Sequence, residues 1–160
     1  MPETVTFPGA RAPDRFRPVE SHGVRIAVHE WGDPDAPPIA LAHGGFDFAR
    51  TYDVFAPLLA DAGWRVVSWD QRGHGDSQHA ALYSWEADLR DALAVVDTVT
   101  DGALPVLGHS KGGAVMVQFA AALPHYEEAL RGAGPQAAWR HDLVVRLLGG
   151  AESASETARA

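Results

Sequence analysis

Residues 104–123 read LPVLGHSKGGAVMVQFAAAL, and this stretch decides the fold. Its first part, 104–107, is an apolar run that is too short for a helix and suits a buried strand. The segment 108–112 (GHSKG) follows, and the Ala-rich apolar residues after it predict a helix that ends before Pro124. The order is therefore strand, G-x-S-x-G, helix, which is the context in which this motif places a serine on a sharp turn.

The serine of this turn, Ser110, is the first candidate for a functional residue. The flanking Gly108 and Gly112 carry no Cβ, so the strand and the helix can approach each other closely. We expect the hydroxyl at the carboxyl edge of the sheet and at a helix N-terminus, where unpaired N–H groups and the helix dipole favour developing negative charge. A chance G-x-S-x-G is the alternative, and the strand and helix on either side argue against it.

Composition excludes several classes of function. A chain of 160 residues with 46% hydrophobic residues indicates one globular domain. The formal net charge of −8 argues against nucleic acid or an anionic membrane as the main partner. Without cysteines the chain has no disulfides and no thiolate metal sites. No run is apolar enough for a signal peptide or a bilayer span, so we expect a cytoplasmic protein.

Segments with strand and helix character alternate along the chain. Short or alternating apolar runs predict strands over 16–20, 24–31, 39–42, 64–69 and 104–107. Apolar residues at helical spacing predict further helices over 50–62 and 85–99. The turn at 21–23 (SHG) indicates that the first two strands form an antiparallel hairpin. Strands that alternate with helices imply an α/β fold, with a mostly parallel sheet flanked by helices.

Three motifs together resemble the N-terminal half of an α/β-hydrolase. They are IALAHGG at 39–45, WDQRGHGDS at 69–77 and LPVLGHSKGG at 104–113, and they occur in the family's order. The combination is far more specific than any one of the motifs. The resemblance implies a truncated α/β-hydrolase with strand order 1-2-4-3-5, in which the first two strands are antiparallel.

The resemblance and the composition divide the chain into four parts. An N-terminal arm over 1–15 precedes the α/β-hydrolase core half-domain at 16–124. An atypical and helical C-terminal segment is expected over 125–150. A small and polar tail at 151–160 is expected to be disordered.

The resemblance also implies a serine hydrolase site. Ser110 would be the nucleophile, and the backbone N–H groups of Lys111 and Gly45 would form the oxyanion hole. Phe46 is the next candidate donor and could line an acyl pocket as a substrate-binding residue. A small-molecule substrate with an ester, thioester or amide-like acyl bond is implied, with no metal and no cofactor. Serine rather than aspartate at this position disfavours the dehalogenases and epoxide hydrolases of the family.

Several other polar residues are expected to be structural. His43 precedes the serine, whereas the family's order is serine, acid, histidine, so we expect it to brace its loop by hydrogen bonding. The resemblance treats the turn at 70–77 as structural, with Arg72 bonded to nearby carbonyls or a carboxylate. His74 and His79 lack the spacing of a metal site and are expected to be exposed loop histidines.

The remainder of the chain does not resemble the second half of the family. Glu127 or Glu128 followed by His141 preserves the order of a catalytic acid and histidine, but order alone does not identify a triad. Residues 143–148 could form a sixth strand or, with Trp139, a helix, and the helix has the better spacing.

Two explanations of this C-terminus stay open. Either the gene is truncated or frameshifted, or the chain is one piece of a larger assembly.

By resemblance we expect a serine hydrolase that is weakly active or inactive in this form. The alternative is a non-catalytic remnant or a binding module on the same scaffold. In either case the strand at 104–107 would lack an outer neighbour, and we expect self-association through this exposed sheet edge.

Overall fold

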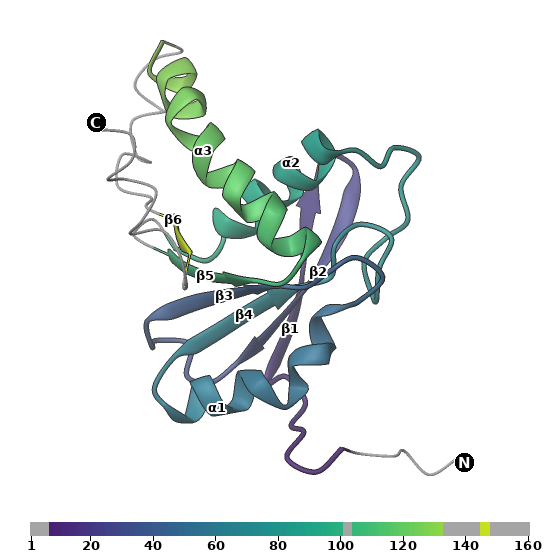
Figure 1. Cartoon of the computed structure of the whole chain (residues 1–160), viewed down its shortest axis with the longest axis vertical. Helices are drawn as coiled ribbons and strands as arrows, with labels where there is room; N and C mark the ends of the chain where they lie inside the picture. The colour runs from purple at the N-terminus through teal and green to yellow at the C-terminus, as the bar shows by residue number, and fades with distance from the viewer. Residues whose placement is uncertain (1–6, 101–103, 133–144, 148–160) are drawn as a thin grey trace.

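The computed structural model describes residues 7–100, 104–132 and 145–147 of the chain. In these residues six strands form one sheet in the order β1-β2-β4-β3-β5-β6 (Figure 1). The strands are β1 (Arg15–Ser21), β2 (Val24–Trp31), β3 (Pro38–Ala42), β4 (Arg65–Trp69), β5 (Leu104–Gly108) and β6 (Val145–Leu147). The helices are the 3₁₀-helix η1 (Ala49–Asp53), α1 (Phe55–Asp61), α2 (Trp85–Val96) and α3 (Lys111–Gly132).

The sheet is mixed because β2 runs against its neighbours. β2 pairs antiparallel with both β1 and β4, whereas β3 pairs parallel with β4 and with β5. The hairpin between β1 and β2 turns at His22 and Gly23, which adopt positive φ of 49° and 80°. The predicted order 1-2-4-3-5, with its first two strands antiparallel, is therefore confirmed.

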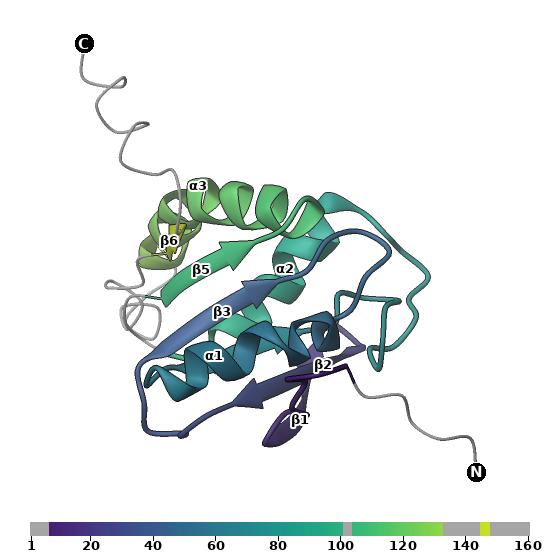
Figure 2. The same ribbon diagram turned by 60° about the horizontal axis from the view of Figure 1, so that its bottom comes forward.

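Helices cover both faces of the sheet. α2 and α3 pack on one face, and η1 and α1 lie on the other (Figures 1 and 2). Successive residues of β3 alternate between the two cores: Ala40 and Ala42 face α2 and α3, and Ile39 and Leu41 face η1 and α1. Both sides of the strand are buried, which explains why its sequence reads as a continuous apolar run.

Two helices differ from their predicted bounds. The predicted helix over 50–62 is divided into η1 and α1, with Val54 between them. α2 ends at Val96 rather than at residue 99. Its start agrees with the prediction, because the Ser84 hydroxyl accepts a hydrogen bond of 3.2 Å from Ala87 N–H as an N-cap.

The prediction that the last helix ends before Pro124 is wrong, because α3 continues to Gly132. Proline lacks one N–H and disfavours helix at the residue before it, so it removes one bond of the ladder and costs about 3 kcal/mol. It does not prevent a helix where strong helix formers follow. The sequence after it, HYEEAL, contains two glutamates, an alanine and a leucine.

A sixth strand lies beside β5. β6 pairs parallel with β5 through the partners Leu104↔Val145, Pro105↔Arg146 and Val106↔Leu147. The preference for a helix over 143–148 is therefore wrong at these three residues, and the strand alternative holds. The backbone N–H and C=O groups on the outer edge of β5 need hydrogen-bond partners, and a short extended segment can supply them. The spacing of apolar residues within 143–148 carries no information about this pairing. Trp139, His141 and the 151–160 tail lie outside the described residues.

Among the described residues, no helix is both long enough and apolar enough to cross a bilayer.

Candidate active site

Ser110 lies on the turn between β5 and α3. β5 ends at Gly108 and α3 begins at Lys111, so only two residues connect them. Ser110 is exposed and has a φ of 50°, a left-handed conformation that is uncommon for a residue with a Cβ. The predicted strand, turn and helix around the serine are therefore present.

The glycines of this turn are required by close backbone contacts. A Cβ on Gly112 would overlap the carbonyl oxygens of Ala42 and His43 at the end of β3. A Cβ on Gly108 would lie 2.5 Å from Gly113 Cα, nearer than atoms can pack. The N–H of His109 donates a 2.9 Å hydrogen bond to the Ala42 carbonyl. The turn is thus held against the carboxyl end of β3 by its own backbone.

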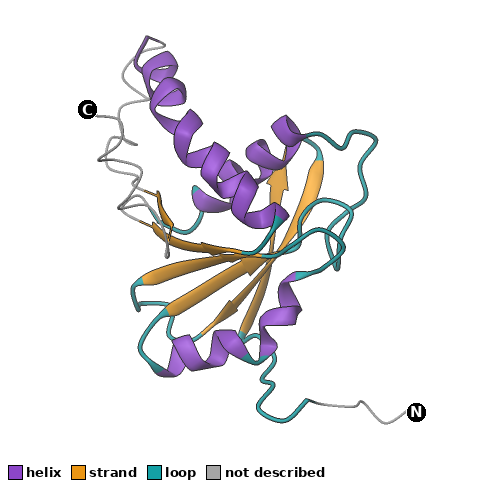
Figure 3. Ribbon diagram, viewed as in Figure 1, coloured by secondary structure: helices purple, strands orange, loops and turns teal. Residues whose placement is uncertain are grey.

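The loop after β3 lies against the same turn. A Cβ built on Gly44 would be 2.8 Å from His109 Nδ1 and 3.5 Å from Ser110 Cβ. One built on Gly45 would be 3.9 Å from Lys111 Cβ. The residues predicted to act together are therefore neighbours, at the edge of the sheet where the loops after β3 and β4 gather near the start of α3 (Figure 3).

Phe46 is the next residue of that loop and is unusual in two ways. Its φ is 61°, in the left-handed region, and its relative exposure is 106%. An apolar ring of this size is held in solvent beside the serine turn. Such a ring is available to a ligand.

The side chain of Lys111 points to α2. Its Nζ lies 2.9 Å from Asp88 Oδ2, and the two side chains are 30% and 9% exposed. The ammonium group is therefore neutralised by a carboxylate of this chain. The side chain is thus occupied by this ion pair, and the backbone N–H is the group of Lys111 that remains a candidate for the site.

The described residues do not identify a general base for Ser110. Among the described residues, no side chain forms a hydrogen bond with its hydroxyl. Glu127 and Glu128 lie in α3, but their side chains are not described. His141, the predicted partner in chain order, lies outside the described residues.

His43 braces its loop, as expected. The ring is fully buried, and its Nδ1 lies 2.7 Å from the Gly44 carbonyl oxygen. Its Nε2 accepts a 2.9 Å hydrogen bond from the Gln71 backbone N–H, and the Gln71 amide donates to the His43 carbonyl at 2.6 Å. Burial lowers the pKa of His43, in line with a neutral ring that donates through Nδ1. The imidazole thus joins the loops after β3 and β4.

Asp70 organises the turn after β4. Its Oδ1 accepts a hydrogen bond from Ala49 N–H at 2.6 Å, and its Oδ2 accepts one from Asp76 N–H at 2.7 Å. His29 Nε2 lies 3.2 Å from the same Oδ2. Burial alone would raise the pKa of Asp70, but the hydrogen bonds from His29 and the two N–H groups outweigh it and lower the pKa. The structural role expected for this turn is confirmed.

Arg72 has the structural role expected of it. Its Nε and Nη2 form a two-pronged ion pair with the Asp91 carboxylate at 2.7 and 2.8 Å, and its Nη1 donates to the Leu82 carbonyl at 2.8 Å. The hydrogen bonds to Asp91 raise the pKa of Arg72 despite its burial.

The prediction of exposed loop histidines holds for His79 only. His74 is half-buried, with its ring centroid 5.5 Å from that of His43.

One family profile and several hydrolases of known sequence match this chain. The profile of the family described as "serine aminopeptidase, S33" matches residues 34–155. A serine hydrolase-like protein of Dictyostelium discoideum is 32% identical over 112 residues, which cover 68% of this chain and 31% of that protein. Epoxide hydrolase A of Mycobacterium tuberculosis is 36% identical over 103 residues, 62% of this chain and 32% of that protein.

A solved structure shows the same arrangement. The thioesterase domain from the curacin biosynthetic pathway superimposes with a TM-score of 0.66 at 30% identity, over 69% of this chain and 40% of that domain. The chain thus spans about a third of the length of the two relatives and two-fifths of the thioesterase domain.

Proposed function

The chain belongs to the serine aminopeptidase S33 family of α/β-hydrolases, and on this premise we propose that Ser110 is the nucleophile of a serine hydrolase. The substrate class is a small molecule with an ester, thioester or amide-like acyl bond. The observation that carries the proposal is the exposed Ser110 with its φ of 50°, which lies beside Gly44 and directly before the start of α3.

The residues of this chain would have the following roles in the reaction. The Ser110 hydroxyl oxygen attacks the acyl carbon, and its proton passes to a base. The backbone N–H groups of Lys111 and Gly45 donate to the oxyanion, and the N-terminus of α3 favours the negative charge there. The leaving group departs with a proton, and water then releases the acyl group from the serine. Phe46 would contact the apolar part of the substrate.

Serine at position 110 favours acyl transfer over epoxide opening. The relatives include a protein named epoxide hydrolase as well as serine hydrolase-like and thioesterase proteins. A serine ester formed on Ser110 can be hydrolysed by water, which completes a turnover. The thioesterase domain, with its TM-score of 0.66, is a structural precedent for this proposal.

We expect the 160-residue chain on its own to be a weak catalyst. No side chain of the described residues forms a hydrogen bond with the Ser110 hydroxyl, and serine proteases that lose a triad member keep only about 10³–10⁴-fold catalysis over water. Hydrolysis of p-nitrophenyl acetate by the wild type and by Ser110→Ala tests this. Slow hydrolysis that Ser110→Ala abolishes supports the proposal, and equal rates contradict it. Fast hydrolysis that depends on Ser110 would reveal a base, with His141 the first residue to examine.

The second candidate function is a non-catalytic module that associates through its sheet edge. β5 has five residues and β6 pairs with three of them, and no further strand lies beyond β6 in the described residues. An open edge of this kind can pair with another chain. Sedimentation velocity over a hundredfold concentration range tests it, because self-association raises the sedimentation coefficient with concentration. A monomer at every concentration contradicts this second candidate.

A further inference from the structure

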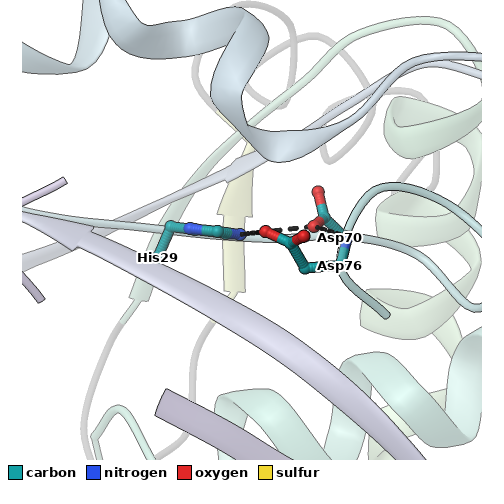
Figure 4. Close-up of side chains that lie close together, drawn as sticks. All are labelled: His29, Asp70 and Asp76. Carbon is teal, nitrogen blue, oxygen red and sulfur yellow. Dashed lines mark hydrogen bonds and ion pairs between the residues drawn. The ribbon is translucent and has the colours of Figure 1, made fainter. Parts of the chain in front are cut away.

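Three side chains from separate segments converge at a place that the Ser110 chemistry does not use. They are His29 on β2, Asp70 directly after β4, and Asp76 in the following turn (Figure 4). His29 Nε2 lies 3.2 Å from Asp70 Oδ2 and 3.9 Å from Asp76 Oδ2. One nitrogen and two carboxylate oxygens therefore lie within 4.8 Å of one another.

These separations fit a small divalent cation. Zn²⁺ binds imidazole nitrogen and carboxylate oxygen at about 2.1 Å, which places neighbouring ligand atoms about 3.4 Å apart in a tetrahedral site. The measured 3.2 and 3.9 Å bracket that spacing. Small movements of the Asp76 side chain, which is 67% exposed, would bring its oxygen to the ion.

The two inner ligands are already held in position. The side chains of His29 and Asp70 are only 3% and 2% exposed. The Asp70 carboxylate is oriented by Ala49 N–H on one oxygen and by Asp76 N–H on the other. Hydrogen bonds of this kind to a ligating carboxylate are typical of metal sites.

We propose that His29, Asp70 and Asp76 bind a divalent first-row transition-metal ion, with water at the remaining position. The imidazole nitrogen favours such ions over Mg²⁺ and Ca²⁺, which prefer oxygen ligands. Two carboxylates supply the compensating charge. The ion would be bound by the neutral tautomer of His29 that carries its proton on Nδ1, because this tautomer leaves the Nε2 lone pair free for the metal. The ion would join β2 to the turn after β4 and stabilise the folded chain.

The same geometry has a rival interpretation without a metal. The N–H of His29 Nε2 can instead donate a buried hydrogen bond to the Asp70 carboxylate. The two interpretations differ in one measurable property, because only a metal site binds Zn²⁺ with a stoichiometry of one and loses that binding when Asp76 is neutralised.

Calorimetric titration of the full chain with ZnCl₂, on protein without a polyhistidine tag, decides between them. We expect one Zn²⁺ per chain and a rise in the melting temperature that grows with Zn²⁺ concentration. Asp76→Asn should weaken binding about tenfold or more. This side chain is exposed, and its backbone N–H still holds Asp70, so the variant is expected to fold. Asp35→Asn, the same chemical change at an exposed loop position, should bind Zn²⁺ like the wild type.

A second pair of variants separates this site from adventitious histidine binding. His29→Gln should lose the site, whereas His79→Gln, which changes an exposed histidine, should keep it. Circular dichroism in the absence of Zn²⁺ checks that each variant is folded. The proposal is overturned if the wild type binds no Zn²⁺ at millimolar concentration. It is also overturned if Asp76→Asn binds Zn²⁺ as tightly as Asp35→Asn does.

Discussion

Lys111 Nζ lies 2.9 Å from Asp88 Oδ2, so the first residue of α3 is tied to the first turn of α2. A cation at a helix N-terminus is unfavourable, because the dipole there is positive. The Asp88 carboxylate offsets the charge of the residue that carries the proposed oxyanion donor. The ion pair therefore joins the start of α3 to α2.

A double-mutant cycle with Lys111→Met and Asp88→Asn should give a coupling energy of about 1 kcal/mol, measured from urea unfolding. The pair is only 30% and 9% exposed, so water screens it weakly. The matched control is the Arg11–Asp61 pair, which is 44% and 65% exposed and should couple by less than about 0.5 kcal/mol. Equal coupling in the two cycles would contradict this interpretation.

Gly112→Ala should strongly destabilise the chain, by about 3 kcal/mol or more, or prevent folding. Its Cβ would overlap the Ala42 and His43 carbonyl oxygens, which are backbone atoms and cannot move aside. Gly45→Ala is the control, because its Cβ would lie 3.9 Å from Lys111 in ordinary contact. Urea unfolding of both variants makes the comparison, and similar free energies would show that the turn is not closely packed.

The buried Asp70 carboxylate should make stability depend on acid pH. Its pKa is lowered in the folded state, so its contribution is present above the unfolded value of about 3.9 and is lost as the pH falls through the lower folded value. Asp70→Asn should cost about 1–3 kcal/mol at pH 7, and this difference should shrink below pH ~4. A difference that stays constant between pH 7 and pH 3 would contradict the lowered pKa.

The buried Tyr52 hydroxyl should make stability depend on alkaline pH. This hydroxyl donates to the Ala42 carbonyl at 3.1 Å, and burial, together with the charge of Asp47, raises its pKa to about 12. Because the folded pKa exceeds the unfolded value of about 10, its stabilisation is lost as the pH rises from 10 through 12. Titration at 295 nm should show a late-ionising tyrosine that Tyr52→Phe removes, and a late component that persists in Tyr52→Phe would contradict this assignment.

Much of the fold could be predicted because it depends on local sequence. Among the five predicted strands, β2 has the predicted bounds, β3, β4 and β5 differ by one residue at one end, and β1 is one residue longer at each end. A buried parallel strand needs an apolar run, and the turn with Ser110 needs glycines, so both leave local signals. The strand order came from the resemblance, since no local pattern specifies which strands are neighbours.

The features that were missed depend on contacts between distant segments. β6 exists through pairing with β5, and α3 continues through Pro124, although the proline predicted an end there. His29 meets Asp70 and Asp76 only because β2 lies beside β4, with His29 opposite Ser68 in the register. The sequence signal, a lone histidine in a strand, does not suggest such a site.

The most direct test of Ser110 as a nucleophile is reaction with a fluorophosphonate probe, mapped by peptide mass spectrometry. The folded chain should be labelled slowly and at Ser110, because its turn and the neighbouring N–H groups remain in place without a complete triad. Ser110→Ala and the urea-unfolded wild type should not be labelled. If the folded wild type reacts at Ser110 no faster than the unfolded chain does, the fold does not activate this serine and the account of a serine hydrolase is wrong.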